Sequence, residues 1–590
     1  MKERTLPIDS TFNVVTFDLL IEGKAMDSAY QVLSIAIVKE VNRVPWAKIV
    51  LRDGDPAAET FAISEKENYT PGKKIVVKVG RDRKNTMLFR GIITKHAIRL
   101  RENGTSELSL ECRDECTRMT IGRHNGYFEE RKDSEVMEEL IGKYPGLSAD
   151  VESTSLKHKE LVQFHCTDWD FMLSRADING KLVIADDGKI QIKAPDTGSS
   201  PSVTLLHGST MLEFEAEMDA RTQLKSVEAK SWDYGGQQLF QHQSDSAPIA
   251  EPGNLKGATL ADSVNISSFE LRHSGQVLEA ELQEWTKSVM LRSRLAKIRG
   301  SARFVGLPDI KPGQMVELQG VGDRFNGKAF ISAVRHDIFQ GSWHTSVQFG
   351  LSPDCFHQTT ENILDSSAAG LLPGVHGLQI GKVVQLQNDP DGEHRILVRL
   401  PMVDNAAQGT WARMASLDAG KDRGAFFRPE IDDEVIVGFI NGDPRDAVVL
   451  GMLNSSAKPA PITVKDTNHE KGFFTRSKMR VHFHDETKTI TIDTPAGNSI
   501  ELDEKGSSIT IKDQNGNSTI MKPAGIEMKS KGNISIEATG KIDIKAGAAL
   551  TISAAQMTLS AQGPMEVKGA TAKLSSPGIT EISGSLVKIN

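Results

Sequence analysis

The segment Gly532-Asn-Ile-Ser-Ile-Glu-Ala-Thr-Gly-Lys-Ile-Asp-Ile-Lys-Ala-Gly547 contains one short pattern twice. In each copy two apolar residues flank a single polar residue, and a joint with glycine follows. Side chains two positions apart on a strand point to the same face, so each pair predicts a short, half-buried strand. Such pairs run from Thr489 to the end of the sequence, and we predict that they form the core of a needle: Ile490, Ile492, Ile500, Leu502, Ile509, Ile511, Ile534, Ile536, Ile542, Ile544, Leu550 and Ile552.

The spacing of these pairs indicates how many chains build the needle. From Ile526 onward the pairs recur every 7–8 residues. One strand of that length cannot bury its own apolar stripe, so it must stack on copies of itself in a β-solenoid. A unit this short supplies one strand and one corner, whereas three identical chains wound together would close a triangular prism. The pattern therefore predicts an intertwined trimeric β-helix; a low-complexity adhesive tail would lack the regular apolar pairs.

Before the predicted needle, the sequence contains five short apolar runs that are separated by Gly, Pro, Asn and Asp. Five strands in about 80 residues favour a small barrel of the oligonucleotide/oligosaccharide-binding (OB) type. Several of its turns are acidic and an aromatic stacking ladder is not evident, which argues against nucleic-acid binding. The expected strands are Leu378–Leu386, Arg395–Leu400, Gly409–Ala415, Glu434–Ile440 and Ala447–Leu453.

At 590 residues the chain exceeds what one hydrophobic core can organise, so several domains are expected. The N-terminal half alternates like strands, with a few helical stripes. The predicted organisation is a region of two β-rich domains with helical inserts over 1–358, a linker over 359–376, the OB barrel over 377–455, a connector over 456–488 and the needle over 489–590. The predicted fold class is therefore mainly β.

Composition narrows the function classes. The net charge of −8 argues against a dedicated nucleic-acid binder, which would need clustered Lys and Arg. The first 17 residues do not read as a signal peptide, and we see no apolar stretch of membrane-spanning length. Four cysteines are too few for a disulfide framework in a chain this long, which favours synthesis in a reducing cytoplasm.

Several motifs stand in order along the full length. They are Pro71-Gly72 with Phe89-Arg-Gly-Ile-Ile-Thr94, Asp168-Trp-Asp-Phe171 with Arg175-Ala176 and Gly180, Arg428-Pro-Glu-Ile-Asp-Asp-Glu-Val435, Gly442-Asp-Pro444 and Thr494-Pro-Ala-Gly-Asn498. Together they resemble the VgrG family, the spike of type VI secretion, and its relatives in phage tails and extracellular injection particles, and this resemblance implies that 1–358 is a tail-hub-like region. One departure is Asp432, where family members usually carry Gly, and this leaves the geometry of that turn open.

The resemblance implies a homotrimer that is made in the bacterial cytoplasm and assembled into a contractile particle, either cell-anchored or released. Its hub would sit on the inner tube and contact baseplate proteins, and the needle would meet the target membrane only transiently. A PAAR-repeat protein would cap the C-terminal end, and effectors would travel with the spike. The expected docking surface for this tip is formed by Leu586, Val587, Lys588, Ile589 and Asn590.

Catalytic residues, cofactors and resident metals are not expected. The gap between barrel and needle, 454–476, is too short for an inserted enzyme, and no C-terminal effector domain is expected after the final strand. His482 and His484 share a face and could gather six imidazoles around a trimer axis, but an ordinary outward position at the start of the needle is favoured. The alternatives are a tail-spike enzyme acting on surface polysaccharide and a passive β-helical adhesin.

Overall fold

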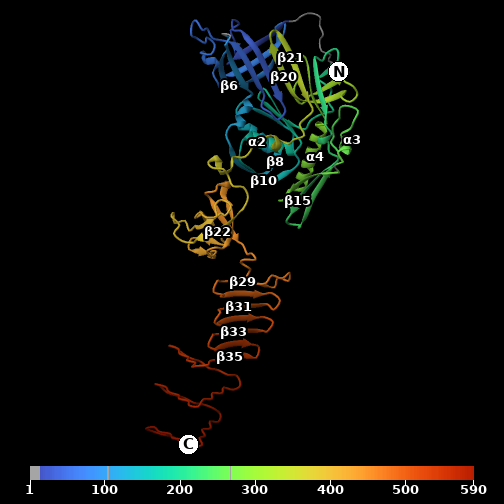
Figure 1. The fold of residues 1–590 in the computed structure, drawn as a ribbon. Coiled ribbons are helices and arrows are strands. Elements are labelled where there is room, and N and C mark those ends of the chain that lie inside the picture. The colour runs from blue at the N-terminus through green and yellow to red at the C-terminus, as the bar shows by residue number, and fades with distance from the viewer. Residues whose placement is uncertain (1–13, 103–104, 266, 590) are drawn as a thin grey trace. The chain divides into compact units, whose positions relative to one another are not determined.

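The computed structural model describes residues 14–102, 105–265 and 267–589. It divides the chain into two compact units, Met1–Met452 and Leu453–Asn590. Strands account for 39% of the residues and helices for 12%, which confirms the mainly β prediction. Figure 1 shows the elements of both units in chain order along the colour bar.

The first unit is built around a 13-stranded sheet, and its central junction is the antiparallel pair β3–β20, with Ala36 opposite Asp337. Alternating burial along the strands gives the sheet two separate apolar cores, one around Ile37 and Phe89 and one around Phe304 and Phe349. In spatial order the sheet contains β14 (Glu213–Met218), β18 (Ile298–Val305), β21 (Ser342–Phe349), β20 (Gly327–Phe339), β3 (Val32–Glu40), β4 (Trp46–Arg52), β7 (Ser106–Arg113), β6 (Lys84–Leu100), β5 (Lys74–Arg81), β1 (Val15–Ile21) and β2 (Lys24–Ala25), with β13 (Val203–Leu206) and β19 (Met315–Gln319) joined through β20.

Helices and small sheets are inserted between these strands. A third core lies between α1 and α2, and the helix α4 packs against β15 and β16. These inserts comprise α1 (Asp133–Gly142), α2 (Asp168–Ile178), α3 (Gly257–Ser263), α4 (Glu279–Leu295) and α5 (Phe356–Thr359), with β8 (His124–Lys132), β9 (Ser148–Val151), β10 (Lys157–Cys166), β11 (Leu182–Asp186), β12 (Lys189–Lys193), β15 (Val227–Asp233), β16 (Gln238–Ser244) and β17 (Phe269–His273). The single-turn α5 follows β21 and leads toward the barrel.

The predicted barrel closes as β22-β23-β24-β28-β27, and all five expected strands are present. Apolar side chains such as Val398 and Val437 fill its interior, because alternate residues of each strand face inward. The barrel strands are β22 (Gln379–Gln385), β23 (Ile396–Arg399), β24 (Thr410–Met414), β27 (Glu434–Phe439) and β28 (Ala447–Met452), and a small hairpin of β25 (Ala419–Gly420) and β26 (Arg423–Gly424) extends from it.

Asp432 occupies the turn for which the sequence left the geometry open. Its φ is +70°, in the left-handed region that glycine adopts most readily. The turn is held by the Asp432 N–H, which donates to the Val383 carbonyl at 2.9 Å, and by an ion pair from Lys382 at 2.9 Å. The chain therefore keeps the backbone conformation of a glycine turn with an aspartate in it.

The second unit contains one seven-stranded sheet in which every strand pairs antiparallel with the next. Two points differ from the sequence prediction. The sheet starts at Glu470, inside the stretch predicted as a connector, and it is a meander rather than a coil of solenoid turns. Its strands are β29 (Glu470–Phe474), β30 (Arg480–His484), β31 (Thr489–Asp493), β32 (Ser499–Asp503), β33 (Ser508–Lys512), β34 (Ser518–Lys522) and β35 (Gly525–Lys529). In Figure 1 they form a ladder of rungs.

Regular secondary structure ends with β35 in the described residues. In the described residues 534–589 the chain forms neither helix nor strand, and it appears in Figure 1 as the red zigzag trace. Side chains throughout this segment are exposed. The repeats in 534–589 therefore do not pair with one another within a single chain, whereas the earlier predicted repeats do so in the meander.

Candidate functional site

One face of the meander carries two continuous ladders of apolar side chains. The antiparallel register places Ile490 opposite Leu502, and Leu502 opposite Ile509. Residues directly opposite each other share a face of the sheet, so these pairs extend into unbroken rows. One row contains Phe483, Ile490, Leu502, Ile509, Met521 and Ile526, and the other Phe473, Val481, Ile492, Ile500 and Ile511. We call this surface the apolar ladder face.

The apolar ladder face is uncovered in the single chain. Ile492 is 45% exposed, and Leu502 is 40% exposed. The opposite face of the sheet is mostly polar and is less exposed than the apolar ladder face. Thr510 on that opposite face, for example, is only 8% exposed. A soluble protein rarely leaves a contiguous apolar surface of this kind in water, so the face requires a partner surface.

Two asparagines join the turns along one edge of the sheet. The Asn498 Oδ1 accepts a hydrogen bond from the Gln514 N–H at 3.1 Å, across to the next turn on that edge. The Asn517 Oδ1 accepts from the Lys531 N–H at 2.8 Å and from the Ser530 hydroxyl at 3.0 Å. These bridges fix the spacing of the turns and connect β35 to the start of the extended repeats.

The extended repeats expose the remaining predicted core residues. Their exposed fractions range from 50% at Ile542 to 72% at Ile536. Within the described part of this segment, 534–589, no two backbone groups hydrogen-bond to each other. Backbone amides without partners and exposed isoleucine side chains lie together in this segment. Strands from other chains could pair with these amides and cover these side chains.

The residues predicted to dock a tip lie at the end of these repeats. Leu586 is 75% exposed, Val587 46% and Ile589 83%. Lys588 is exposed as well, and Asn590 lies outside the described residues. The exposed apolar side chains leave this stretch available for a partner.

The two histidines considered as metal ligands lie on β30, on the face opposite the apolar ladder face. His482 pairs with Glu470 at 3.3 Å, and His484 stacks on His469 with ring centroids 6.2 Å apart. In the part of the chain that the structure describes, His482 and His484 join no group of three metal-binding residues whose ligand atoms all lie within 4.8 Å. In the single chain His482 and His484 therefore lie side by side on the polar face of the sheet. The hypothesis of a metal on a trimer axis stays untested.

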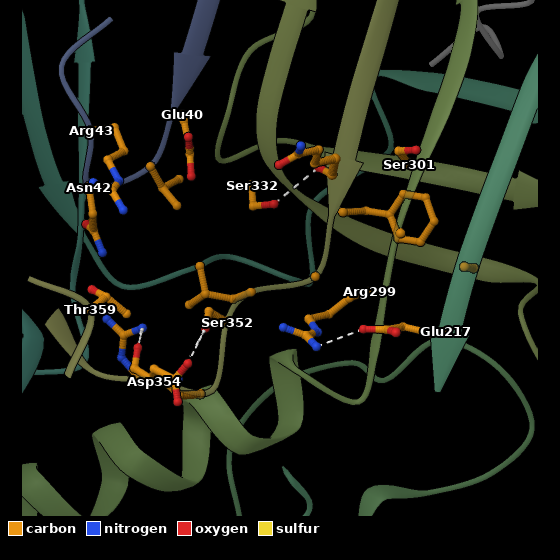
Figure 2. Close-up of a pocket in the computed structure, with 18 of the residues that line it drawn as sticks. Glu40, Asn42, Arg43, Glu217, Arg299, Ser301, Ser332, Ser352, Asp354 and Thr359 are labelled. Atoms are coloured by element: carbon orange, nitrogen blue, oxygen red, sulfur yellow. Dashed lines mark hydrogen bonds and ion pairs between the residues drawn. The ribbon is translucent and has the colours of Figure 1, made fainter. Parts of the chain in front are cut away.

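The hub contains a hollow of about 560 Å³ between β3, β14, β18 and the loop after β21 (Figure 2). Two of its arginines are held by protein partners: Arg299 donates to the Glu217 carboxylate at 2.7 Å, and Arg292 donates to the Asp354 backbone carbonyl at 3.2 Å. Burial raises the pKa of Glu40, and the nearby Arg43 charge opposes that shift. Arg299 and Glu217 thus neutralise each other on the wall of the hollow.

The sequence motif around Arg175 takes part in a buried network that sequence reasoning missed. Asp133 accepts hydrogen bonds from Arg175 at 2.6 and 3.1 Å and from Asn179 at 2.9 Å, and it contacts His158 at 3.0 Å. Arg175 also reaches Glu281 at 2.9 Å. The one sequence signal for this network is the arginine at position 175, four residues after the motif Asp168-Trp-Asp-Phe171.

Comparison with known proteins adds family relationships to this geometry. A family model described as the Alg8 N-terminal domain matches residues 11–340, which is more than half of the chain. The chain belongs to the Alg8 N-terminal domain family. A second model, the type VI secretion system/phage-baseplate injector OB domain, matches residues 379–453, where the closed barrel lies.

Individual relatives confirm the resemblance to VgrG-family spike proteins. The type VI secretion system spike protein VgrG3 of Vibrio cholerae is 32% identical over 101 residues, which cover 16% of this chain and 10% of the relative. VgrG1a of Pseudomonas aeruginosa is 23% identical over 204 residues, covering 32% and 31%. The chain thus matches less than a third of the length of either relative.

A solved structure resembles part of the chain. It is the 43 kDa tail protein of prophage MuSo2 from Shewanella oneidensis, with 12% identity and a TM-score of 0.46. The similarity covers 57% of this chain and 98% of that protein. Separately, along the described residues no helix has both the length and the apolar character needed to cross a membrane.

Proposed function

We propose that this protein is the trimeric, non-enzymatic central spike of a contractile injection system. The observation that carries the proposal is the uncovered apolar surface of the second unit, in the apolar ladder face and in the repeats 534–589. Three chains that turn these surfaces toward a common axis would bury them and pair the free backbone groups. A structure closed in this way has no exposed sheet edge.

The closed prism would suit a device that is driven through an envelope. In the repeats 534–589 each chain would hydrogen-bond to the other two, so separation of the chains would require unwinding these repeats. Outward Lys, Glu, Thr and Ser side chains would keep the rod soluble and limit adhesion to lipid. The VgrG relatives, which are type VI secretion spike proteins, support this role.

The hub would attach the spike to the inner tube and baseplate of the machine, and effectors would travel with the spike. Support comes from the phage-baseplate injector OB domain match over the barrel. We propose synthesis in the bacterial cytoplasm followed by assembly into a cell-anchored or released particle. The ion pair between Arg299 and Glu217 in the hub hollow favours a structural role for that wall over catalysis.

The mass of the protein in solution tests the proposal. Light scattering of the full chain is expected to give three times the 64.5 kDa of one chain. A version that stops at Ser455 removes the meander and the repeats, so its assembly should be weaker and sensitive to SDS and heat. A full chain that stays monomeric would contradict the trimeric spike.

The tip-docking role predicts a selective defect. We expect Ile589→Asp to reduce binding of a PAAR-repeat protein by at least about tenfold, because a charge replaces an apolar contact worth about 1.5–3 kcal/mol. The trimer should remain intact, since this side chain belongs to the last of many repeats. Co-purification with the tip protein measures the effect, and Lys573→Ala, at an exposed position in an earlier repeat outside the docking stretch, serves as the control. Unchanged capture of the tip would refute the docking assignment.

A further inference from the structure

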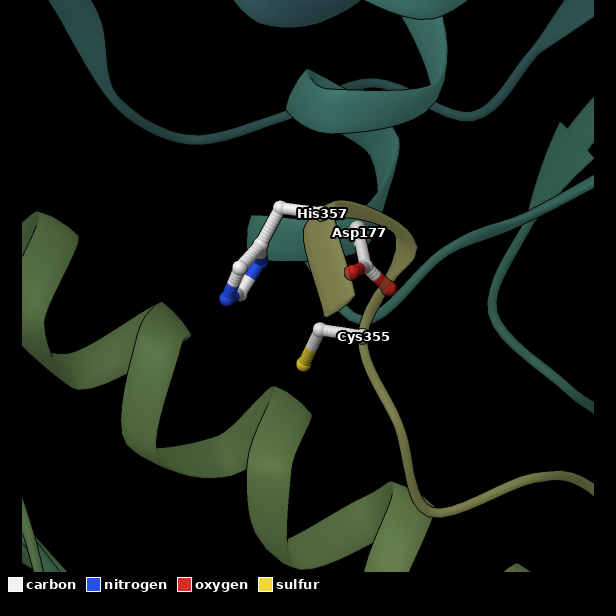
Figure 3. A group of neighbouring side chains, drawn as sticks. All are labelled: Asp177, Cys355 and His357. Carbon is white, nitrogen blue, oxygen red and sulfur yellow. The ribbon is translucent and has the colours of Figure 1, made fainter. Parts of the chain in front are cut away.

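Three side chains that metals favour meet where the loop after β21 returns to the hub. Asp177 lies near the end of α2, Cys355 precedes α5, and His357 lies within α5. One carboxylate oxygen, the thiol sulfur and one imidazole nitrogen all lie within 4.8 Å of one another. Figure 3 shows the three side chains grouped beside α4.

The donor set fits Zn²⁺. Thiolate, imidazole and carboxylate are the three ligand types that zinc uses, usually in tetrahedral geometry with water able to fill an open position. In such a site the donor atoms are about 3.5 Å apart, so the group would have to contract by roughly 1 Å. The α5 helix is a single turn of four residues after an irregular loop, and a small shift of this turn would bring Cys355 and His357 closer to α2.

The carboxylate is already oriented by a second layer of contacts. The buried Arg292 guanidinium donates to the Asp177 Oδ1, and the Phe356 N–H donates to the Oδ2 at 2.9 Å. Metal-bound carboxylates in proteins are held by partners of this kind, which fix the ligand before the ion arrives. The Cys355 thiol also hydrogen-bonds to this carboxylate, and metal binding, which releases the thiol proton, would free the accepting lone pair for the ion. The positive charge of Arg292 would be offset by Asp177 itself and by the thiolate that zinc binding creates.

Exposure gives the ion a route to the site. Asp177 is 8% exposed and Cys355 is partly exposed, while His357 is open to solvent. The other three thiols are enclosed, with Cys112 and Cys116 at 0% and Cys166 at 5% exposed. Of the thiols in the chain, Cys355 is therefore the one best placed to meet a metal from solution.

We propose that Asp177, Cys355 and His357 bind one Zn²⁺ per chain, with water as the fourth ligand. The ion would fasten the segment just before the linker, 355–357, to α2 and thus to the hub helices. A cross-link there would resist pulling on the linker. This inference concerns the hub alone and does not depend on the spike function.

Cobalt titration of the reduced full-length protein tests the site, because Co²⁺ reports thiolate ligation by a charge-transfer absorption. One Co²⁺ per chain with that absorption is expected, and Zn²⁺ should displace it. Cys355→Ser should remove the absorption. His357→Ala should weaken metal binding by at least about a hundredfold, because loss of a residue that only supports a ligand already costs up to about that much. The matched control His273→Ala, also an exposed histidine, should bind like the natural chain.

Three outcomes would overturn the proposal: no absorption in the natural chain, an absorption that survives Cys355→Ser, or equal affinity in His357→Ala and His273→Ala. His357 is exposed, so its substitution tests the site even if the Cys355 variant folds poorly. A melting temperature of the hub that rises with Zn²⁺ in the natural chain, but not in His357→Ala, would be the independent supporting readout.

Discussion

Leu502→Asp is expected to prevent formation of a stable trimer while leaving the single chain folded. Leu502 lies in the middle of the apolar ladder face, between Ile490 and Ile509, and is 40% exposed in one chain. An aspartate at a half-exposed position has little effect on the free chain. In a closed prism the same position would be interior, and threefold symmetry would bring three carboxylates together without partners.

The size of the effect follows from burial. Each chain would lose about 1.5–3 kcal/mol of apolar transfer energy and would also have to bury a charge or protonate it, so the assembly is destabilised by at least about 3 kcal/mol per chain. The measurement is the mass in solution by light scattering, together with the temperature at which the SDS-resistant species disappears. We expect the variant to behave as a monomer at concentrations where the natural chain is trimeric.

Thr491→Asp is the matched control. Thr491 lies on the neighbouring strand β31 but on the opposite, polar face, between His482 and Glu501. Because this face is lined by polar side chains, the same charge is not forced into an apolar core and should leave the trimer intact. Equal loss of assembly in both variants would mean that the polar face is buried too, and identical trimers in both would show that the apolar ladder face does not face the axis.

The sequence predicted which residues of the needle share a face, but not the direction of neighbouring strands. Alternation with a period of two is the same for parallel and antiparallel pairing, so Ile490 and Ile492 carry no information on this point. The turns do carry it: Asp513-Gln-Asn-Gly516 is a hairpin signal between two short strands, β33 and β34. The later repeats lack such turns, and there the single chain stays extended.

The barrel was predictable because its determinants are local. Five apolar runs and the turns between them define the strands, and closure follows from strand number. The candidate zinc ligands and the Asp133 network could not be predicted, because their residues are far apart in the sequence. Asp177 lies near Cys355, and Arg175 contacts Glu281. A single sequence contains no signal for such pairs until a fold brings them together.

Arg175→Met is expected to lower the free energy of unfolding of the hub by about 3–5 kcal/mol at neutral pH, the usual result of leaving a buried charge without its partner. Asp133 is 1% exposed, and Arg175 supplies two of its hydrogen bonds. Burial alone would raise the pKa of Asp133, but hydrogen bonds from His158 and Arg175 and the Arg175 charge hold this pKa well below its usual range.

The sign of the pH dependence follows from that shift. A carboxyl whose pKa is depressed by folding stabilises the folded state above its unfolded pKa of about 3.9, and this stabilisation is lost as the pH falls toward the folded value. Without Arg175 the buried carboxyl should instead have a raised pKa, which destabilises the variant above about pH 4. The difference between the two proteins should therefore be largest at neutral pH and shrink below about pH 4.

Urea denaturation followed by tryptophan fluorescence measures this effect, since Trp169 is buried on α2 beside the network. The control is Arg221→Met, which removes an arginine whose side chain is 86% exposed and paired with Asp219. Exposed pairs of this kind contribute at most about 1 kcal/mol, so the control should unfold close to the natural chain. If Arg175→Met matched Arg221→Met at every pH, Asp133 would have to be satisfied by His158 and Asn179 alone, and the arginine behind Asp168-Trp-Asp-Phe171 would have no structural role.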